Sequence, residues 1–192
     1  MMKTIDRLST KKVLILSLFL ISSGQLDAAN ATDTGRSDAE KIAKAEKEES
    51  RAPIGCKNVG YEFDMKTLRL LSQSVGAKQT LYFLYNKRNE SVTLYQMLGD
   101  ESSRSMYMNH KIDGKQWAVL STSEKKMKYI CAIPDGKTPY GKIIDCADSL
   151  NVCEYDNVRY GMNNQGNYWL VNSNTRNGAV NAVVHYGIIP GV

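Results

Sequence analysis

Few side chains in this 192-residue sequence could carry out covalent chemistry or bind a metal. The thiols and imidazoles are those of Cys56, Cys131, Cys146, Cys153, His110 and His185. A Ser-His-Asp or Cys-His mechanism would need one of the two histidines. His110 borders an expected turn and His185 falls within an expected strand, and both positions favour surface or structural roles. The nucleophile-elbow, zinc-protease, phosphate-loop and dinucleotide-binding motifs do not occur in the sequence. We therefore predict no catalytic residues, no bound metal and no cofactor.

A group of carboxylates surrounds the last two cysteines. Its members are Asp145, Asp148, Glu154 and Asp156. Paired carboxylates can serve glycoside hydrolysis or hold calcium. Calcium loops place oxygen ligands at regular alternating positions, and this segment lacks that alternation, so we interpret it as a polar loop.

The first 31 residues have the layout of a secretory signal peptide. Basic residues precede an apolar run from Val13 to Ile21, and the small-residue site Ala29-Asn30-Ala31 follows it. A retained membrane anchor is the alternative, but the run is shorter than the roughly 20 apolar residues that a spanning helix needs. We predict that residues 1–31 are removed and that the mature chain begins at Thr32. We expect no integral membrane segment after cleavage and a periplasmic, outer-membrane-associated or secreted location.

Export would place the four cysteines in an oxidising compartment, where an even number predicts disulfide bonds. Three connectivities are possible. Cys146 and Cys153 enclose only six residues that include turn formers, so we favour Cys146–Cys153 together with Cys56–Cys131. A zinc site is the alternative, but this spacing is not that of a zinc ribbon and both histidines are distant in sequence.

Composition divides the exported chain into two parts. Residues 32–52 are dominated by charged side chains, with Ile42 as the only large apolar one. Ser37 and Glu40 form a capping box, so a solvated helix could follow it. Because no apolar face is present, we predict a charged flexible or helical arm, with a docking arm that orders on a partner as the alternative. Residues 53–192 are predicted to form a single β-rich globular domain.

The domain sequence predicts a mainly β fold. Aromatic and β-branched runs alternate with turn residues at roughly ten-residue intervals. We expect one short helix at 63–72 and strands at 79–86, 91–97, 104–109, 116–121, 126–133, 141–146, 151–160, 167–173 and 178–189. This spacing predicts an antiparallel β-sandwich or barrel stapled by disulfides. The last strand is expected to offer a free edge to a partner's sheet.

Aromatic and amide side chains form the candidate binding surface. The eleven tyrosines and two tryptophans can stack on sugars or bases, or anchor an interface, and the stretch from Asn163 to Asn181 is rich in asparagine. The candidate binding residues are Tyr168, Trp169, Asn172, Asn174, Arg176 and Asn177. Core packing of the rings and turn formation by the asparagines are the alternative interpretation.

The net charge argues against some classes of partner. The chain carries +5 at neutral pH, and about +3 remains once the predicted signal peptide is removed. The Lys and Arg residues are scattered, so we expect no binding to nucleic acid and no polybasic attachment to a membrane.

Several stretches of the sequence are similar to a known family. They are YFLYNKRNESVTLYQM (82–97), NHKIDGKQWAVLSTS (109–123), KYICAIP (128–134), GKIIDCADSLNVCEY (141–155) and GNYWLVNSNTRNGAV (166–180). In these stretches the chain resembles the EnhB-like enhanced-entry family of small exported proteins of Legionella and its relatives. The resemblance implies an accessory factor linked to invasion of host cells, or an accessory subunit of the outer-membrane core of the type IVB (Dot/Icm) secretion system. It supplies no catalytic residues.

We weigh three functional hypotheses. The leading one is a non-enzymatic structural or accessory interaction protein of an envelope assembly, with other envelope proteins as partners. The second is a soluble periplasmic binding module, either a lysozyme inhibitor or a glycan-binding protein, that uses the aromatic and asparagine side chains. The third is an enzyme without a recognisable motif.

Overall fold

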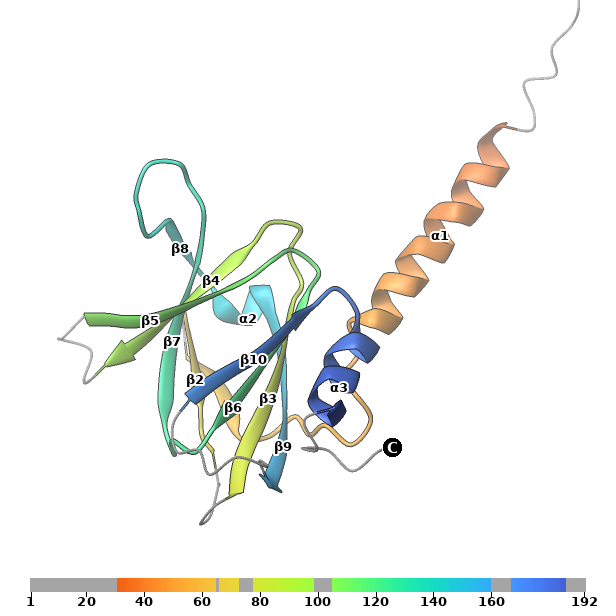
Figure 1. Ribbon diagram of the computed structural model, residues 1–192. Helices are drawn as coiled ribbons and strands as arrows, with labels where there is room; N and C mark the ends of the chain where they lie inside the picture. The colour runs from red at the N-terminus through yellow and green to blue at the C-terminus, as the bar shows by residue number, and fades with distance from the viewer. Residues whose placement is uncertain (1–30, 65, 73–77, 99–104, 160–166, 186–192) are drawn as a thin grey trace, which may run out of the picture. The chain divides into compact units, whose positions relative to one another are not determined.

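The computed structural model describes residues 31–64, 66–72, 78–98, 105–159 and 167–185. Apart from Ala31, the predicted signal peptide lies outside these residues. The chain divides into two compact units, Met1–Ala39 and Glu40–Val192. Helix α1 (Ala31–Glu49) begins in the first unit and ends in the second, and every other described element belongs to the second unit (Figure 1).

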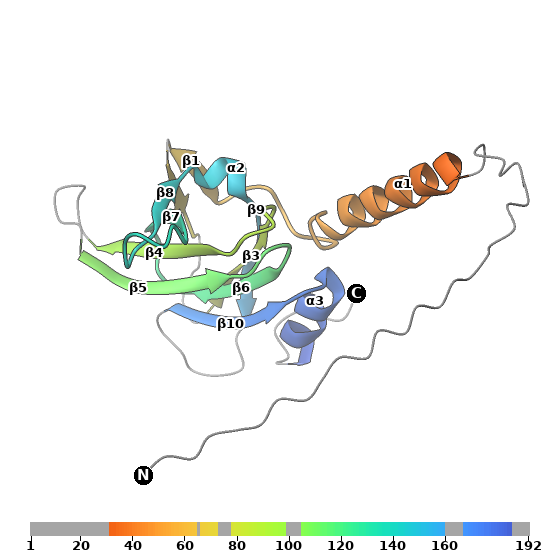
Figure 2. The same ribbon diagram turned by 90° about the horizontal axis from the view of Figure 1, so that it is seen from above.

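Two antiparallel sheets form the second unit, and they can be followed in Figure 1 and Figure 2. The first sheet has the order β1-β2-β7-β4-β5, with β8 also paired to β7. Its strands are β1 (Tyr61–Asp64), β2 (Thr67–Leu70), β4 (Val92–Leu98), β5 (Ser105–Ile112), β7 (Met127–Ile133) and β8 (Lys142–Ile144). The second sheet has the order β10-β6-β3-β9, formed by β3 (Lys78–Asn86), β6 (Trp117–Thr122), β9 (Leu150–Arg159) and β10 (Asn167–Ser173). Two further helices are α2 (Cys146–Ser149) and α3 (Arg176–His185).

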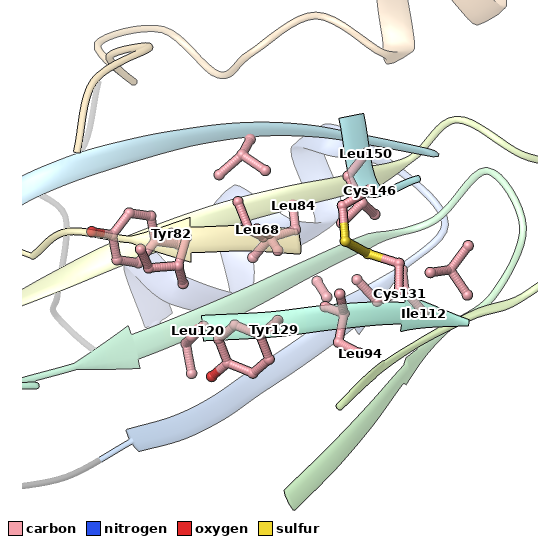
Figure 3. Close-up of a cluster of buried hydrophobic side chains, with 14 of the residues drawn as sticks. Leu68, Tyr82, Leu84, Leu94, Ile112, Leu120, Tyr129, Cys131, Cys146 and Leu150 are labelled. Carbon is pink, nitrogen blue, oxygen red and sulfur yellow. A yellow bond between two sulfur atoms is a disulfide. The ribbon is translucent and has the colours of Figure 1, made fainter. Parts of the chain in front are cut away.

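The larger core cluster lies between the two sheets. Tyr82 and Leu84 of β3 and Leu120 of β6 meet Leu94 of β4 and Tyr129 of β7 there (Figure 3). None of these five side chains is more than 2% exposed. Burial of a large apolar side chain stabilises a fold by roughly 1.5–3 kcal/mol, so this layer is what holds the two sheets together. The predicted mainly β, antiparallel fold is confirmed, and of the two expected architectures, a sandwich or a barrel, the structure has the sandwich.

A second cluster lies on the other face of β3 and β6, where α3 covers it. Leu81 and Phe83 of β3 and Val119 of β6 pack there with Ala179 and Val183 of α3. Because β3 and β6 are buried on both faces, their sequences are continuous apolar runs rather than alternations. Such runs are easily recognised, and the predicted boundaries of both strands agree with the structure within one residue.

The predicted helix at 63–72 is wrong, because this segment forms β1 and β2. In β2, Leu68 and Leu70 are buried and the residues before and between them are half-buried. That is the two-residue period of a strand. Leu68 and Leu71 also have the spacing of one helical turn, so the periodicity of this short segment is ambiguous. The pairing of β2 with β7 decides its conformation.

The predicted strand at 178–189 is also wrong over its described part, which belongs to α3. The hydroxyl oxygen of Thr175 accepts a hydrogen bond from the N–H of Gly178 at 3.0 Å and so caps the helix. The buried residues of α3 are Ala179 and Val183, one helical turn apart. The Asn-Gly step that resembles a hairpin turn therefore lies in the first turn of a helix, and this segment provides no edge strand.

Two disulfides form as predicted, but the predicted pairing is wrong. The structure joins Cys56 to Cys153 and Cys131 to Cys146. Cys146 belongs to the cluster between the sheets (Figure 3), whereas Cys153 belongs to the cluster beneath α3. Because these two residues lie on opposite sides of the second sheet, their closeness in sequence does not bring their sulfurs together. Disulfide bonds are typical of proteins that reside outside the reducing cytoplasm.

Candidate binding site

The two sides of the sandwich differ in how their edges are covered. On one side, side-chain contacts join β5 and β10, the edge strands of the two sheets. On the other side lie the edge strands β1 and β9, with α2 near them (Figure 2). Residues of both strands line a cavity. We name these the closed side and the open side.

His110 of β5 joins the sheets on the closed side. Its ring stacks on the indole of Trp169 of β10, with centroids 3.8 Å apart and an interplanar angle of 4°. Its Nε2 lies 2.8 Å from Oδ1 of Asn172, whose Nδ2 donates to the carbonyl of Lys111 at 3.2 Å. The Nδ2 of Asn172 donates to the carbonyl of Lys111, which identifies Oδ1 of Asn172 as the acceptor in the contact with His110. The Nε2 of His110 therefore carries the proton and donates it to Oδ1.

Burial of the ring sets the protonation of His110. Desolvation lowers the pKa of His110 from its usual value of 6.5, and the hydrogen bond with Asn172 opposes this shift in part. A neutral, stacked and hydrogen-bonded imidazole stabilises the contact between two sheets. Its position is structural, although it lies in β5 and not beside a turn as the sequence suggested.

The predicted binding residues of β10 do not share one surface. Trp169 is half-buried, packs against the cluster between the sheets and stacks on His110, while Asn172 bonds His110. Tyr168 is 39% exposed and its side chain leaves the opposite face of the strand. Adjacent aromatic residues in a strand point in opposite directions, so Tyr168 and Trp169 cannot form a single stacking platform.

The remaining predicted binding residues lie at the start of α3. Asn174 and Asn177 are exposed. Arg176 instead holds the end of α1: its main-chain N–H donates to the carboxylate of Glu49, and its guanidinium donates to the carbonyl of Glu48 at 3.1 Å. Arg176 also lies 3.6 Å from the Glu48 carboxylate. These contacts make Arg176 an anchor for the arm, so the six predicted residues are divided among three different environments.

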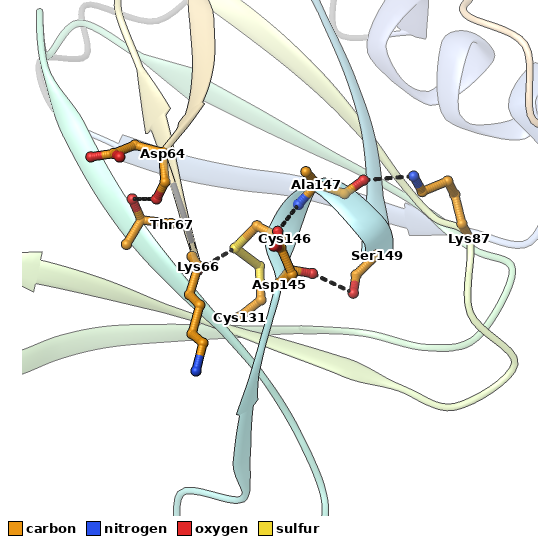
Figure 4. The surroundings of a disulfide bond; sticks show 9 residues. All are labelled: Asp64, Lys66, Thr67, Lys87, Cys131, Asp145, Cys146, Ala147 and Ser149. Atoms are coloured by element: carbon orange, nitrogen blue, oxygen red, sulfur yellow. Dashed lines mark hydrogen bonds between the residues drawn. A yellow bond between two sulfur atoms is a disulfide. The ribbon is translucent and has the colours of Figure 1, made fainter.

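The other residues with chemical potential also lie apart. Asp145 caps α2, its carboxylate accepting the N–H of Ala147 at 2.9 Å (Figure 4). Glu154 is buried in β9, and His185 is exposed at the end of α3 rather than within a strand. In the part of the chain that the structure describes, no three His, Cys, Asp or Glu side chains are grouped where they could hold a metal ion. None of the described helices is both long and apolar enough to cross a membrane.

A cavity of about 430 Å³ lies on the open side. Its lining includes Tyr61 and Phe63 from β1, Asn151 and Val152 from β9, and Lys87 from the turn after β3. A volume of this size is within the range of roughly 300–1,000 Å³ that is usual for ligand sites. The lining combines aromatic rings, an amide and an ammonium group, which suits recognition of a ligand with both apolar and polar parts.

The main chain of β9 also borders this cavity. Glu154 exchanges two main-chain hydrogen bonds of 2.8 Å with Lys57, on the edge of β9 away from β3. Main-chain groups of alternate residues point to the same edge, and β9 pairs regularly with β3 from Asn151 to Tyr155. The N–H and C=O of Val152 therefore point away from β3, to the open side. Among the described residues, no main-chain group forms a hydrogen bond with the N–H or the C=O of Val152.

A second cavity of about 300 Å³ adjoins the first and is positively charged. The two cavities share Ser50, Lys87 and Asn151. The charged side chains that line the second are Lys47, Lys87, Lys115 and Glu46. Three ammonium groups against one carboxylate favour an anionic ligand group at this position.

Sequence reasoning missed the open side. Tyr61 and Phe63 alternate in the sequence, which is a strand signal, but the helix expected at 63–72 hides it. Lys87 is one of many scattered lysines and carries no local signal of a site. Only the folded structure brings these residues together with β9.

No family model matches this chain, and neither does a curated protein or a solved structure. The class of protein that the structure defines is an antiparallel, disulfide-bonded β-sandwich with a cavity between two edge strands.

Proposed function

We propose that this protein is a non-enzymatic, exported interaction component that binds another protein of the bacterial envelope at the open side of its sandwich. The observation that carries the proposal is the cavity between β1 and β9, the two edge strands on that side. Uncovered edge strands are natural docking sites for other polypeptides because their main-chain groups can extend the sheet.

The positions of the reactive side chains support binding rather than catalysis. The four cysteines are held in two disulfides. His110 is stacked on Trp169 and bonded to Asn172, so its ring serves the contact between the sheets. These residues stabilise a rigid scaffold, and a rigid scaffold with an open edge suits a structural or accessory subunit.

Helix α1 offers a second surface to a partner. Its side chains are exposed from residue 40 to residue 48, and the contacts of Glu48 and Glu49 with Arg176 hold its end against the start of α3. An anchored, charged helix of this kind can be recruited by a short complementary interface.

A periplasmic or outer-membrane-associated location completes the proposal, with secretion as the alternative. The disulfides support a position outside the cytoplasm. The resemblance to the EnhB-like family favours an accessory place in the outer-membrane core of a type IVB secretion system, or a part in host-cell invasion.

Affinity purification from gently solubilised and cross-linked envelopes tests the proposal. The tagged full chain should be recovered in a large complex with a reproducible set of envelope proteins, and the untagged chain should recover none of them. Recovery as a free monomer, under conditions that keep other envelope complexes intact, would show that the protein is not an assembly component.

A glycan-binding or lysozyme-inhibiting module is the second candidate, because the same cavity combines rings and amides. Tyr61 and Phe63 lie beside Asn58 and Asn151 in its lining. Co-sedimentation with insoluble peptidoglycan and inhibition of lysozyme activity are the two relevant assays. Absence of both effects removes this candidate.

A further inference from the structure

We infer that the open side binds an extended peptide segment of its partner, which adds as a strand to the outer edge of β9 and places an acidic side chain near Lys87 and Lys115. This inference deepens the proposed function and rests on it, since it names the chemical form of the partner's binding segment.

The outer edge of β9 has a short stretch without a main-chain partner among the described residues. Lys57 pairs with Glu154 through two main-chain hydrogen bonds, which occupies the edge at that residue. At the start of the strand, the N–H of Leu150 bonds to the carbonyl of Cys146. Between these two positions lies Val152, which lines the cavity and is only 4% exposed. Its N–H and C=O point away from β3, so a bound chain reaches them through the cavity. A donor and an acceptor on one residue of an edge strand are what an added strand pairs with.

The edge of β1 presents the same kind of groups. The N–H of Leu71 donates to the carbonyl of Gly60 at 2.7 Å, so the main chain of Gly60 points toward the β2 side. Because β1 and β2 pair regularly, the main-chain groups of Tyr61 and Phe63 point away from β2. Both residues line the cavity. An extended chain on the open side therefore meets edge strands of both sheets, and its apolar side chains meet the rings of Tyr61 and Phe63.

The charge of the lining selects an acidic segment. Lys87 belongs to both cavities, and its ammonium group is held in place by donation to the carbonyl of Ala147 at 2.7 Å (Figure 4). Lys115 and Lys47 line the adjoining cavity, with Glu46 as the one carboxylate. A carboxylate on the bound segment is attracted by this excess of positive charge.

The rings of the lining are not arranged as a sugar platform. Trp117 is only 1% exposed, and its indole N–H donates to the carbonyl of Glu49 at 3.1 Å. Tyr61 and Phe63 meet edge to face, with an interplanar angle of 76° and centroids 5.6 Å apart. Sugar binding by stacking needs an open ring face, and these contacts favour the packing of apolar side chains instead. A peptide therefore fits the open side better than a glycan does.

A phage-displayed library of random nine-residue peptides, selected against the full chain exported to the periplasm of a bacterial host, provides the probe. We expect enriched peptides to combine apolar residues at alternate positions with an acidic residue. The most enriched peptide, made synthetically, should slow hydrogen exchange at the Val152 amide by at least about tenfold, because its main chain accepts that N–H. An unchanged exchange rate at Val152 in the saturated complex would overturn strand addition.

Two pairs of variants separate the main-chain contact from the charge. Val152→Pro removes the outward N–H without removing a hydrogen bond to β3, and it should weaken peptide binding by at least about tenfold. Val152→Ala also shortens this buried side chain but keeps the N–H, so it should weaken binding much less than Val152→Pro does. Lys115→Glu should weaken binding by about fivefold to tenfold, and Lys126→Glu, an exposed lysine outside both cavities, should not. If Val152→Pro does not fold, the comparison of Lys115→Glu with Lys126→Glu and the hydrogen-exchange measurement at Val152 still test the inference.

The remaining outcomes each overturn the inference. Failure to enrich any peptide, or affinity unchanged by Lys115→Glu, contradicts an acidic strand on the open side. Binding of soluble peptidoglycan fragments that displaces the peptide assigns the cavity to a glycan. Recovery of the Lys115→Glu chain in the same envelope complex, at the same yield as the unaltered chain, refutes the peptide inference and leaves the proposed function standing. Recovery of the unaltered chain only as a free monomer refutes the proposed function itself.

Discussion

Replacement of Gly60 by alanine should destabilise the protein much more than the same replacement at Gly136. Both glycines have positive φ angles, +70° at Gly60 and +66° at Gly136. A Cβ at Gly136 would meet nothing within 4 Å, whereas one at Gly60 would lie 1.9 Å from Oε2 and 2.3 Å from Cδ of Glu154. The carboxyl group of Glu154 would have to move, and Glu154 is only 1% exposed.

The expected magnitudes follow from these two environments. The left-handed backbone costs alanine about 1–2 kcal/mol, which both variants share. Displacing a buried group in a packed interior adds roughly 1–3 kcal/mol, which applies to Gly60 alone. We therefore expect Gly136→Ala to lower the free energy of unfolding by about 1–2 kcal/mol and Gly60→Ala by about 2–5 kcal/mol.

Urea denaturation of the two variants measures this difference directly, provided that the slope with denaturant is unchanged. A double-mutant cycle with Glu154→Ala isolates the close approach: in that background, Gly60→Ala should cost no more than Gly136→Ala does. Equal losses for the two single variants, or no coupling with Glu154, would show that the contact between Gly60 and the carboxyl group does not limit stability.

Two further predictions concern the disulfides and His110. The Cys56–Cys153 disulfide spans 97 residues and Cys131–Cys146 spans 15, so replacing both cysteines of the longer loop by alanine should lower the free energy of unfolding by about 1.7 kcal/mol more than the same change in the shorter loop. Urea denaturation of the two double variants measures this difference, and a larger loss for the shorter loop contradicts the chain-entropy account. Burial lowers the pKa of His110 below its unfolded value of 6.5, so the unfolded chain binds more protons than the folded chain as the pH falls. The contribution of His110 to stability is therefore fully present above pH 6.5 and is lost as the pH falls through the folded pKa. His110→Phe keeps a ring against Trp169 and should lose less stability than the unaltered chain between pH 7.5 and 5.0; identical pH profiles for the two proteins would exclude this role.

The parts of the fold that sequence reasoning predicts correctly are those with a strong local signal. The apolar runs of β3 and β6 are buried on both faces, so few other conformations could accommodate them. The signals fail where two periods coincide. Leu68 and Leu71 fit a helix, yet Leu68 and Leu70 are the buried pair, and only pairing with β7 distinguishes these possibilities.

The end of the chain shows the opposite failure. Valines near residue 180 favour a strand by propensity, but the cap at Thr175 and the burial of Ala179 and Val183 produce a helix. Tertiary packing on the cluster beneath α3 overrides local preference here. A search for a capping residue before the valines would have revealed the helix.

The open side could not be predicted from sequence because its parts are separated along the chain. Tyr61, Lys87 and Val152 have no shared local pattern, and the property that distinguishes Val152 is the direction of its main-chain groups. That direction depends on the register between β9 and β3, which composition does not encode.

The nesting of the two disulfides affects how an exported chain matures. Cys131–Cys146 lies wholly within the span of Cys56–Cys153. A chain that crosses a membrane with its N-terminus first delivers its thiols in sequence order, so Cys56 encounters Cys131 before its native partner has emerged. Oxidation in order of arrival forms that mispaired bond first, and thiolate attack must then exchange it. If the chain is exported as predicted, we therefore expect its native pairing to need an isomerase that reshuffles bonds, and an oxidase alone to leave part of the protein mispaired.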